Sequence, residues 1–541
     1  MKSKICFLIL TFIFVLTFAA CGSADPAPAA DTTVTTVDTP DTTAEVQDTT
    51  EEPLPIVAAG GEIVWLTPSE SPAIDNIFEN DEATNDILRQ IMEGLVWFAP
   101  GNVLEPRLAE SIDISDDALV YTFNLRRGVY FHDGTPFNAE AVRRSLLRSI
   151  DPDNAAQAAF VIEMIDTIEV VDDHTVVITL QFPFAPFLAH MTHPIGFIIA
   201  PSAIDEMEAG GRTVTENPIG TGPYIFAYRE HGNYTRFVPN PNHWSGSTPA
   251  HELVYRVIPD TATRLAMMDV GEGNAMRGLA SQVHELYMMP HVDWWRVEGV
   301  GLTYIGFQTQ AEGPLADARV RRAVTMAINR EDILYGVQEG EGIIAVGPVR
   351  GGAVMHAPLD VPGLPFDPEA ARELLAEAGF PDGFSTTIWT NEGNAVRARI
   401  TELVQSNLAD VGIEVEISIL EWGTYLERTS EGLHDMFLLG WSTMTGDSDY
   451  GIFPLFHSGE IGAGNRVFFE NARVDELLEQ GRMAVDHAER DRIYREVTEI
   501  LVYEAPMIFL FHPDTPVITN GIDGMFFDFT VAPHFANVTL R

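Results

Sequence analysis

The residues best suited to hold a small molecule lie in one stretch, 440–451, which reads GWSTMTGDSDYG. Trp441 could stack its flat face on a ligand while its indole N–H finds a polar partner. Asp447 or Asp449 could accept hydrogen bonds from a ligand ammonium. Glycines before the tryptophan and between it and the aspartates favour a bent loop over a strand interior. The structural alternatives are a core aromatic for Trp441 and solvated loop charges for Asp447 and Asp449.

Lysine-dependent chemistry is excluded. The 541-residue chain has 32 lysine and arginine residues, and only Lys2 and Lys4 are lysines. A phosphate-binding loop needs the lysine of G-x-x-x-x-G-K-[ST], and Schiff-base or pyridoxal-phosphate chemistry needs a lysine amine. The nucleophile elbow G-x-S-x-G is absent from the sequence, whereas a serine–histidine–acid triad stays open. We expect no enzymatic activity and no cofactor.

The chain has 15 histidines, which raises the question of a metal site. His251 and His284 each precede a glutamate but lack the second histidine of H-E-x-x-H. His190 and His193 stand three residues apart in an apolar stretch with no carboxylate near them in sequence. We therefore expect no metal site, and we keep a nickel or haem complex as an alternative ligand.

The net charge narrows the class of partner. Asp and Glu number 79 against 32 Lys and Arg, which gives a formal charge of −47. Nothing in this balance would neutralise nucleic-acid phosphates or bind anionic lipid through a basic patch. Hydrophobic residues make up 46% of the chain, an ordinary share for a globular protein. The length suits about three or four structural units.

The N-terminus has the features of an export signal. A positively charged start precedes the apolar run Ile5 to Phe18, which is shorter than the ~20 residues of a membrane span. The following residues, Phe18-Ala19-Ala20-Cys21, resemble the bacterial lipobox, whose cysteine is lipidated and becomes the first residue of the mature protein. An ordinary signal peptide beside a chance cysteine is the alternative. We predict a signal peptide over 1–20 and lipid attachment at Cys21, which would anchor the exported protein to the outer face of the cytoplasmic membrane.

The segment from the lipidated cysteine to residue 59 is of low complexity. It consists mostly of Thr, Asp, Ala, Pro and Glu, with no aromatic residue and no cation. Such a segment cannot bury enough apolar surface to offset its ordering entropy, so we predict a disordered, extended tether over 21–59. The only other cysteine, Cys6, would leave with the signal peptide. The mature chain would then have neither a disulfide nor a thiolate metal site.

From residue 60 onward, strand patterns alternate with helix patterns, which indicates an α/β fold. The predicted strands include 61–66, 119–125 and 413–420. The predicted helices include 86–96, 138–150 with its cap at Asn138, and 368–378 with Gly379 as the C-cap glycine.

Several stretches resemble the extracellular solute-binding proteins of peptide-type ABC importers. In family order they include LAES (108–111), YTFNLR (121–126), FHDGTPF (131–137), NPIGTGPY (217–224), NPNHW (240–244), LLAEAGFPDGF (374–384) and EWGTY (421–425). The matches span roughly residues 60–515. The resemblance implies a two-lobed periplasmic-binding-protein-like α/β fold of type II with an extra domain, which closes on its ligand by a hinge.

The resemblance also implies the domain organisation and the partners. Domain I would consist of 60–82, 214–298 and 500–541, domain II of 83–213, and domain III of 299–499. The implied partners are an ABC permease and its separate ATPase subunits, which fits the lack of a nucleotide motif in this chain. We expect a monomer that binds no nucleic acid and reaches the membrane through its N-terminal lipid.

The resemblance assigns the candidate ligand contacts. In the peptide binders of the family, the first aspartate of the loop that matches 440–451 takes the peptide ammonium. Met444 stands at that position, so Asp447 becomes the candidate for a displaced anchor. The run W-S-x-x-T-G-D-S-D-Y resembles the glutathione-binding branch of the family. The predicted ligand-binding residues are Trp441, Thr443, Met444, Thr445 and Asp447 in one lobe and Asn80 in the other, where the neighbouring acids could instead be helix N-cap charges.

The sequence thus predicts an extracytoplasmic binding lipoprotein of an ABC importer. It would capture a peptide or peptide-like solute between two lobes and deliver it to the permease. An exported peptide-sensing receptor or a hydrolase on the same scaffold is the alternative function. A glutathione-like compound and a nickel or haem complex are the alternative ligands.

Overall fold

The computed structural model describes residues 61–78, 81–100, 103–246 and 251–541. The predicted signal peptide, Cys21, the tether and Asn80 lie outside these residues. The described residues all belong to one unit of the chain, Ala58–Arg541. Within them, no helix combines the length and the apolar character that crossing a membrane requires.

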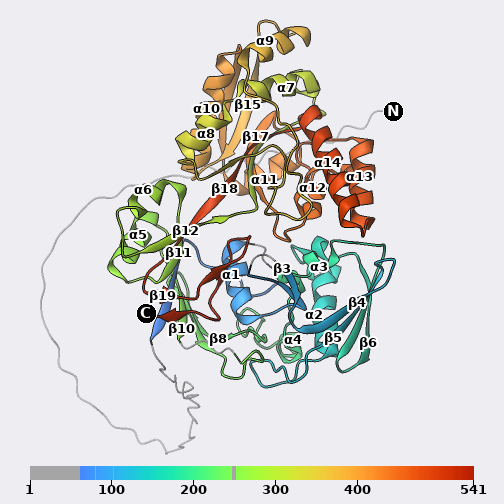
Figure 1. Ribbon diagram of the computed structural model, residues 1–541, viewed down its shortest axis with the longest axis vertical. Coiled ribbons are helices and arrows are strands. Elements are labelled where there is room, and N and C mark those ends of the chain that lie inside the picture. Colours follow the sequence, from blue (N-terminus) through green and yellow to red (C-terminus); the bar gives the residue numbers. More distant parts are fainter. Residues whose placement is uncertain (1–60, 79–80, 101–102, 247–250) are drawn as a thin grey trace, which may run out of the picture. The chain divides into compact units, whose positions relative to one another are not determined.

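A large mixed sheet runs through most of the described chain (Figure 1). In order of pairing, its strands are β16 (Ile413–Leu420), β15 (Phe384–Asn391), β17 (Met436–Ser442), β13 (Gly301–Phe307), β18 (Met507–Thr519), β11 (Ala275–Arg277), β1 (Glu62–Thr67), β10 (Glu252–Val257), β9 (Tyr234–Pro239) and β8 (Tyr224–Glu230). Two further strands, β12 (Asp293–Glu298) and β14 (Gly342–Ile344), pair with β18 beside this path. The pairs β15–β16, β15–β17, β1–β10 and β1–β11 are parallel.

The strand β18 joins the two lobes. Its first part pairs with β13 and β14, and its second part pairs with β11 and β12. The sequence MIFLFHPDTPVIT explains this, because its two apolar ends are buried while His512 is followed by partly exposed residues in the middle. Ile508 lies in the core of β15 and β17, whereas Val517 lies in the core of β1. The chain crosses between the lobes once more, from β12 to β13.

We use domain III for the lobe with β13 to β17, and domain I for the lobe with β1 and β8 to β12. The boundary that the sequence suggests at residue 500 lies ahead of the actual crossing. The last helix, α14 (His487–Glu504), and the first part of β18 still pack in domain III. The crossing therefore falls inside β18, where the partly exposed residues separate its two buried ends.

A second, four-stranded antiparallel sheet lies within residues 83–213, and we use domain II for this sheet and the elements packed on it. Its order is β4 (Ala109–Ile114), β5 (Val120–Leu125), β7 (Thr175–Leu180) and β6 (Ile165–Asp172). Every second residue of β5 and β7 is buried, the pattern of a sheet with one covered face. The hairpin β2 (Val96–Ala99) and β3 (Val103–Pro106) precedes this sheet. The C-terminal segment forms two short antiparallel pairs of two-residue strands. These are β19 (Ile522–Asp523) with β22 (Thr539–Leu540), and β20 (Phe526–Phe527) with β21 (Pro533–His534).

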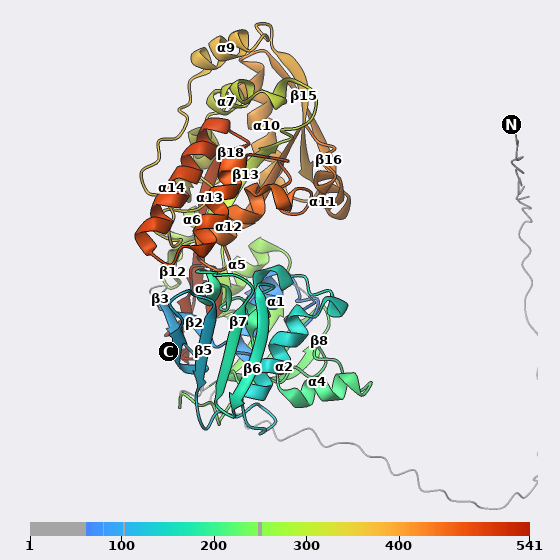
Figure 2. The ribbon, with the colours of Figure 1, turned by 90° about the vertical axis from the view of Figure 1, so that its right-hand side faces the viewer.

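Helices cover the sheets of each domain (Figure 2). In domains I and II they are α1 (Glu82–Ile91), α2 (Ala139–Ile150), α3 (Phe187–His190), α4 (Pro201–Glu208), α5 (Thr261–Val270) and α6 (Val283–Leu286). In domain III, besides α14, they are α7 (Ala318–Ala327), α8 (Arg330–Val337), α9 (Pro368–Glu377), α10 (Ala395–Ala409), α11 (Trp422–Ser430), α12 (Ser448–Phe456) and α13 (Ala472–Met483).

Most of the predicted elements are confirmed, and one helix is misplaced. The helix predicted after Asn138 is α2, and the side chain of Asn138 accepts a hydrogen bond from the Ala141 N–H at 3.0 Å. The helix predicted over 86–96 instead spans Glu82–Ile91, because the carboxylate of Asp81 caps it. The chain turns at Gly94, where a Cβ would lie 3.2 Å from the carbonyl oxygen of Met191, and continues into β2.

Candidate ligand-binding site

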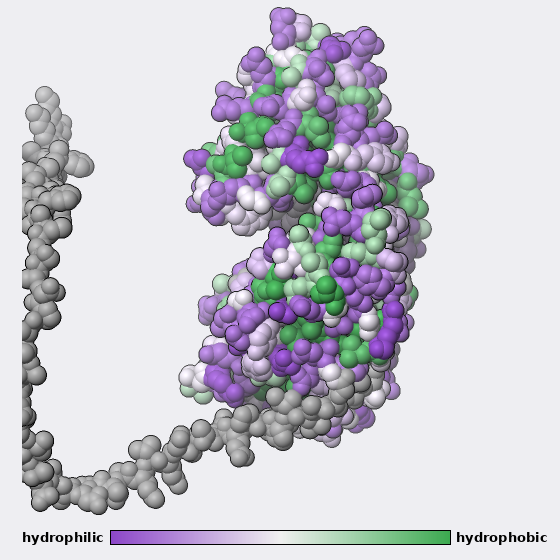
Figure 3. Space-filling view, turned by 90° about the vertical axis from the view of Figure 1, so that its left-hand side faces the viewer, coloured by the Kyte–Doolittle hydropathy of each residue, from purple (hydrophilic) through white to green (hydrophobic). Residues whose placement is uncertain are grey.

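The carboxyl ends of three parallel strands lie together at one edge of domain III. β15, β16 and β17 end at Asn391, Leu420 and Ser442. Ligands of open α/β sheets bind at such edges, because loops and helix N-termini converge there. Helix α11 follows β16 directly and lies at the lower border of domain III in Figure 2. The space-filling view in Figure 3 shows a recess in the surface at about that level.

Trp441 lies near the end of β17, between two cores. Its half-buried side chain packs against the core of domain II and against that of domain III. The indole N–H donates to the carbonyl oxygen of Tyr450 at 3.0 Å, and the two ring centroids are 5.6 Å apart. The structure thus gives this residue a packing role at the junction of two domains and leaves part of its ring accessible.

The loop after β17 is braced by the main chain of Met355. Met355 donates its N–H to the Gly446 carbonyl at 2.8 Å, and its own carbonyl accepts from the N–H of Ser448 at 3.1 Å. The hydroxyls of Thr443 and Thr445 are buried and have no hydrogen-bond partner among the described residues. Unpaired buried hydroxyls are unfavourable, and native structures rarely keep them without a functional reason.

Asp447 is held by an arginine that is distant in the sequence. Its two carboxylate oxygens accept from the guanidinium of Arg490 at 2.7 and 2.8 Å, and it caps α12 by accepting from the Asp449 N–H. Burial alone would raise the pKa of Asp447, but Arg490 holds it below its ordinary value. Both Asp447 and Asp449 are fully buried, so their interpretation as solvated loop charges is wrong. The sequence contains no signal for this pairing, which spans 43 residues.

Asp449 connects domain III to domain II. Its Oδ1 accepts from Nε of Arg482 at 2.8 Å, while its Oδ2 lies 3.6 Å from Nε2 of His190 and forms no hydrogen bond. Nδ1 of His190 lies 2.8 Å from the carbonyl oxygen of Val161. If that nitrogen donates, the neutral imidazole presents an acceptor to the carboxylate. Burial lowers the pKa of His190. The Ala185 N–H also donates to the carbonyl of Arg482 at 2.7 Å, so the two domains meet through main chain as well.

A further cationic group lies at the same edge and was missed from the sequence. Arg397 lies in the first turn of α10, and its Nη1 donates to the side-chain oxygen of Asn391 at 2.7 Å. Its guanidinium carbon lies 5.6 Å from the centre of the Trp422 ring. Its Nη2 lies 3.9 Å from the point that a Cβ on Gly440 would occupy, directly before Trp441.

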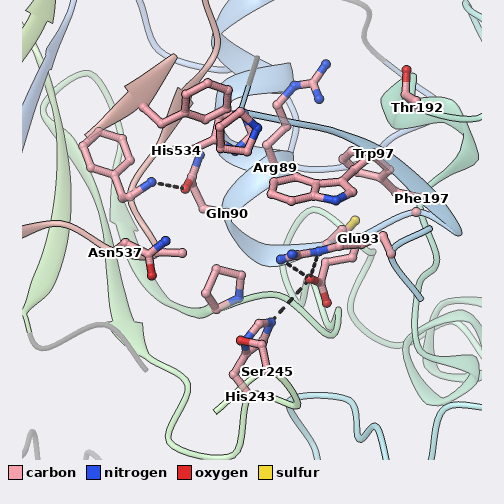
Figure 4. Close-up of a pocket in the computed structure, with 18 of the residues that line it drawn as sticks. Arg89, Gln90, Glu93, Trp97, Thr192, Phe197, His243, Ser245, His534 and Asn537 are labelled. Atoms are coloured by element: carbon pink, nitrogen blue, oxygen red, sulfur yellow. Dashed lines mark hydrogen bonds and ion pairs between the residues drawn. The ribbon is translucent and has the colours of Figure 1, made fainter. Parts of the chain in front are cut away.

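A separate cavity of about 150 Å³ lies between α1, β2 and the C-terminal segment (Figure 4). The carboxylate of Glu93 at its wall accepts from Arg107, Thr221 and Trp244 at 2.7 to 2.8 Å, and Nε2 of His243 lies at 3.4 Å. Burial alone would raise the pKa of Glu93, yet Arg107, His243 and Trp244 lower it to about 2. Both carboxylate oxygens are engaged by the protein, so we interpret this cluster as structural.

Across the described part of the chain, no group of three or more His, Cys, Asp or Glu side chains is placed to hold a metal ion. His193 accepts a hydrogen bond from the Ile195 N–H and lies 6.4 Å, ring to ring, from Tyr450.

The sequence is similar to known proteins over most of its length. The model of the bacterial extracellular solute-binding proteins, family 5 (middle), matches residues 103–463. Heme-binding protein A of Haemophilus influenzae is 33% identical over 451 residues, which cover 78% of this chain and 82% of that protein. The glutathione-binding protein GsiB of Pectobacterium atrosepticum is 30% identical over 467 residues, covering 84% and 88%.

Solved structures show the same fold. HbpA2 from Haemophilus parasuis superposes with a TM-score of 0.79 at 29% identity, covering 89% of this chain and all of that one. The periplasmic binding protein DppA from Helicobacter pylori, in complex with the peptide STSA, gives a TM-score of 0.78 at 29% identity, covering 89% and 98%. The predicted two-lobed α/β fold is confirmed.

Proposed function

Since this chain belongs to the bacterial extracellular solute-binding proteins of family 5, we propose that it captures a peptide or peptide-like solute between its two lobes and delivers it to the permease of an ABC importer. The observation that carries this proposal is the pair of chain crossings, β12 to β13 and the middle of β18, beside a loop with unpaired threonine hydroxyls. Two crossing strands let the lobes rotate as bodies while each keeps its own core.

The ligand contacts in domain III belong to the loop after β17. Trp441 supplies a ring wall, Thr443 and Thr445 supply hydroxyls, and Met444 supplies an apolar surface that packs toward domain II. Asp447 stays our candidate anchor for a ligand ammonium. Both of its carboxylate oxygens are held by Arg490, so an ammonium would have to replace part of that pairing. Asn80 contributes from the other lobe.

The preferred ligand class is a γ-linked, glutathione-like peptide. A methionine cannot accept strongly from an ammonium, so Met444 removes the ordinary peptide anchor. Two relatives named as glutathione-binding proteins are 30% identical over 467 residues and 31% identical over 462 residues. A haem complex is the second candidate, because one relative of comparable similarity is named a heme-binding protein.

Export and anchoring complete the proposal. Cys21 receives the lipid, the segment to residue 59 serves as the tether, and the monomeric body presents its ligand to the permease and its ATPase subunits. Changing Cys21 to alanine should release the protein from the membrane fraction. Unchanged membrane association of that variant would contradict the anchor.

Native mass spectrometry of the purified protein, followed by calorimetry with glutathione and with haemin, tests the function. We expect an intact captured solute and binding of glutathione. At 100 times Kd, a ligand stabilises a one-site native state by ~2.7 kcal/mol. Small-angle scattering should show compaction when that ligand binds. Cleaved fragments of an offered peptide would favour a hydrolase, and tight haemin binding without glutathione binding would favour the haem complex.

A further inference from the structure

Arg397 is a half-buried cation without an acidic partner, in a chain that has far more acids than bases. Its guanidinium makes one side-chain hydrogen bond, to the neutral amide of Asn391 at 2.7 Å. Among the described residues, no carboxylate forms an ion pair or a hydrogen bond with it. The contrast with Arg482 and Arg490, which each hold a buried aspartate at the same end of domain III, is direct.

Arg397 is partly buried, and its surroundings include an exposed aromatic ring and a glycine. The Trp422 ring covers a face of the cation at 5.6 Å, and this tryptophan is itself 45% exposed on α11. Gly440 lies on β17 and has no side chain. A Cβ at this position would lie 3.9 Å from Nη2 of Arg397, so the glycine leaves space beside the guanidinium. Arg397, Trp422 and Gly440 therefore lie together at the carboxyl edge of the sheet, next to Trp441.

The strongly negative net charge of the chain is the reason why a cation at this position matters for binding an anionic ligand. A net charge of −47 repels anionic solutes at long range, so an acidic ligand needs a fixed positive group inside the site. Burial lowers the pKa of Arg397, but arginine stays charged in proteins. Its planar fork matches a carboxylate with two parallel N–H···O bonds.

We propose that Arg397 binds a carboxylate of the transported solute, with the Trp422 ring stacked on the guanidinium and the amide of Asn391 holding it in place. The assignment rests on the proposed function and narrows its ligand class to peptides or peptide-like solutes with a free carboxylate. It also supplies a charged contact that the Met444 position lacks.

Calorimetry with a matched ligand pair tests this assignment. Glutathione carries two free carboxylates, and glutathione diethyl ester has both blocked while its ammonium remains. A hydrogen bond to a charged group corresponds to roughly ten- to a hundredfold in Kd. We expect the native protein to prefer glutathione over the diester by at least about tenfold, and Arg397→Gln to reduce that preference to about one- to twofold. Arg397→Lys, which keeps the charge without the fork, should retain part of it.

Arg399→Gln is the matched control, since Arg399 lies on the same helix, is exposed, and bonds only to the Gly336 carbonyl. It should leave the preference unchanged. Melting temperatures of all variants, measured without ligand, show whether each is folded. If Arg397→Gln is folded and keeps the full preference, the assignment is wrong while the proposed function stands. If the native protein binds neither glutathione nor any captured peptide, the proposed function fails and this assignment with it.

Discussion

Two buried carboxylates, Glu93 and Asp449, show how differently this molecule uses its acids. Glu93 accepts from three side-chain donors at 2.7 to 2.8 Å and lies close to a histidine. Asp449 accepts from Arg482 alone, and its second oxygen faces a histidine nitrogen at 3.6 Å without a hydrogen bond. The first cluster ties the segment after α1 to segments of domains I and II, and the second lies where domain III meets domain II.

This difference in hydrogen bonding distinguishes the Glu93 cluster, which we call a fixed joint, from the contact between Asp449 and His190, which we call a movable one. A buried charge whose oxygens are all engaged stabilises a single arrangement, because any motion would leave it unpaired. A carboxylate with an unengaged oxygen loses less when its neighbours move apart, and water can then solvate it. We therefore expect the Glu93 cluster to persist in every state of the protein, and the contact between Asp449 and His190 to change when the lobes move.

The largest effect should follow from removing Glu93. Glu93→Ala removes the acceptor of three side-chain donors at once, Arg107, Thr221 and Trp244, and leaves the fully buried Thr221 hydroxyl unpaired. We expect this to cost ~3–5 kcal/mol of unfolding free energy. Urea denaturation measures it, and Glu105→Gln, at an exposed position of β3, is the control. A loss below about 1 kcal/mol, within the range of ordinary surface substitutions and small polar changes, would show that the cluster is not the fixed joint.

The pH dependence of stability should carry the signature of the same residue. Its pKa is about 2 in the folded protein against an ordinary value of 4.5. A lowered folded-state pKa contributes stability that is complete above pH 4.5 and is lost as the pH falls toward 2. The contribution amounts to about 3 kcal/mol. Denaturation curves between these two pH values should therefore be less steep in pH for a folded Glu93→Gln variant; equal slopes would contradict this account.

Sequence reasoning predicted the local elements better than the pairings. Period-two and period-3.6 patterns located β5 and α2, because burial of one face repeats along the chain. The loop after β17 was likewise identified from its residue types. Asp447 with Arg490, Asp449 with His190, and Arg397 with Trp422 were not predicted, because each pair is brought together by the packing of separate elements. The sequence also does not distinguish a charged residue that is solvated from one that is buried.

Measurements of ligand specificity test whether the acids of the loop after β17 bind ligand in addition to stabilising the structure. We expect glutathione to bind more tightly than trialanine by roughly ten- to a hundredfold, since Met444 offers no acceptor to an ordinary peptide ammonium. For the same reason, N-acetylation of trialanine should change its Kd little. Calorimetry with Asp447→Asn completes the set. If acetylation abolishes tight binding of trialanine while Asp447→Asn leaves it untouched, the ammonium is held by another acid.

The smallest effect on stability should come from Asp449→Asn, for three reasons. The side chain gives up one charge-assisted hydrogen bond, worth ~1.5–3 kcal/mol at most. Arg482 is 22% exposed in its side chain, so water can solvate the guanidinium once the carboxylate is neutral. The unengaged oxygen has no bond to lose, and an amide there could donate to Nε2 of His190, which replaces two facing acceptors by a donor and an acceptor. We expect a net loss of about 1 kcal/mol or less in urea denaturation, with Glu479→Gln, 63% exposed, as the control. A loss as large as that of Glu93→Ala would mean that both clusters are fixed joints, and that the contact between domains II and III does not change when the lobes move.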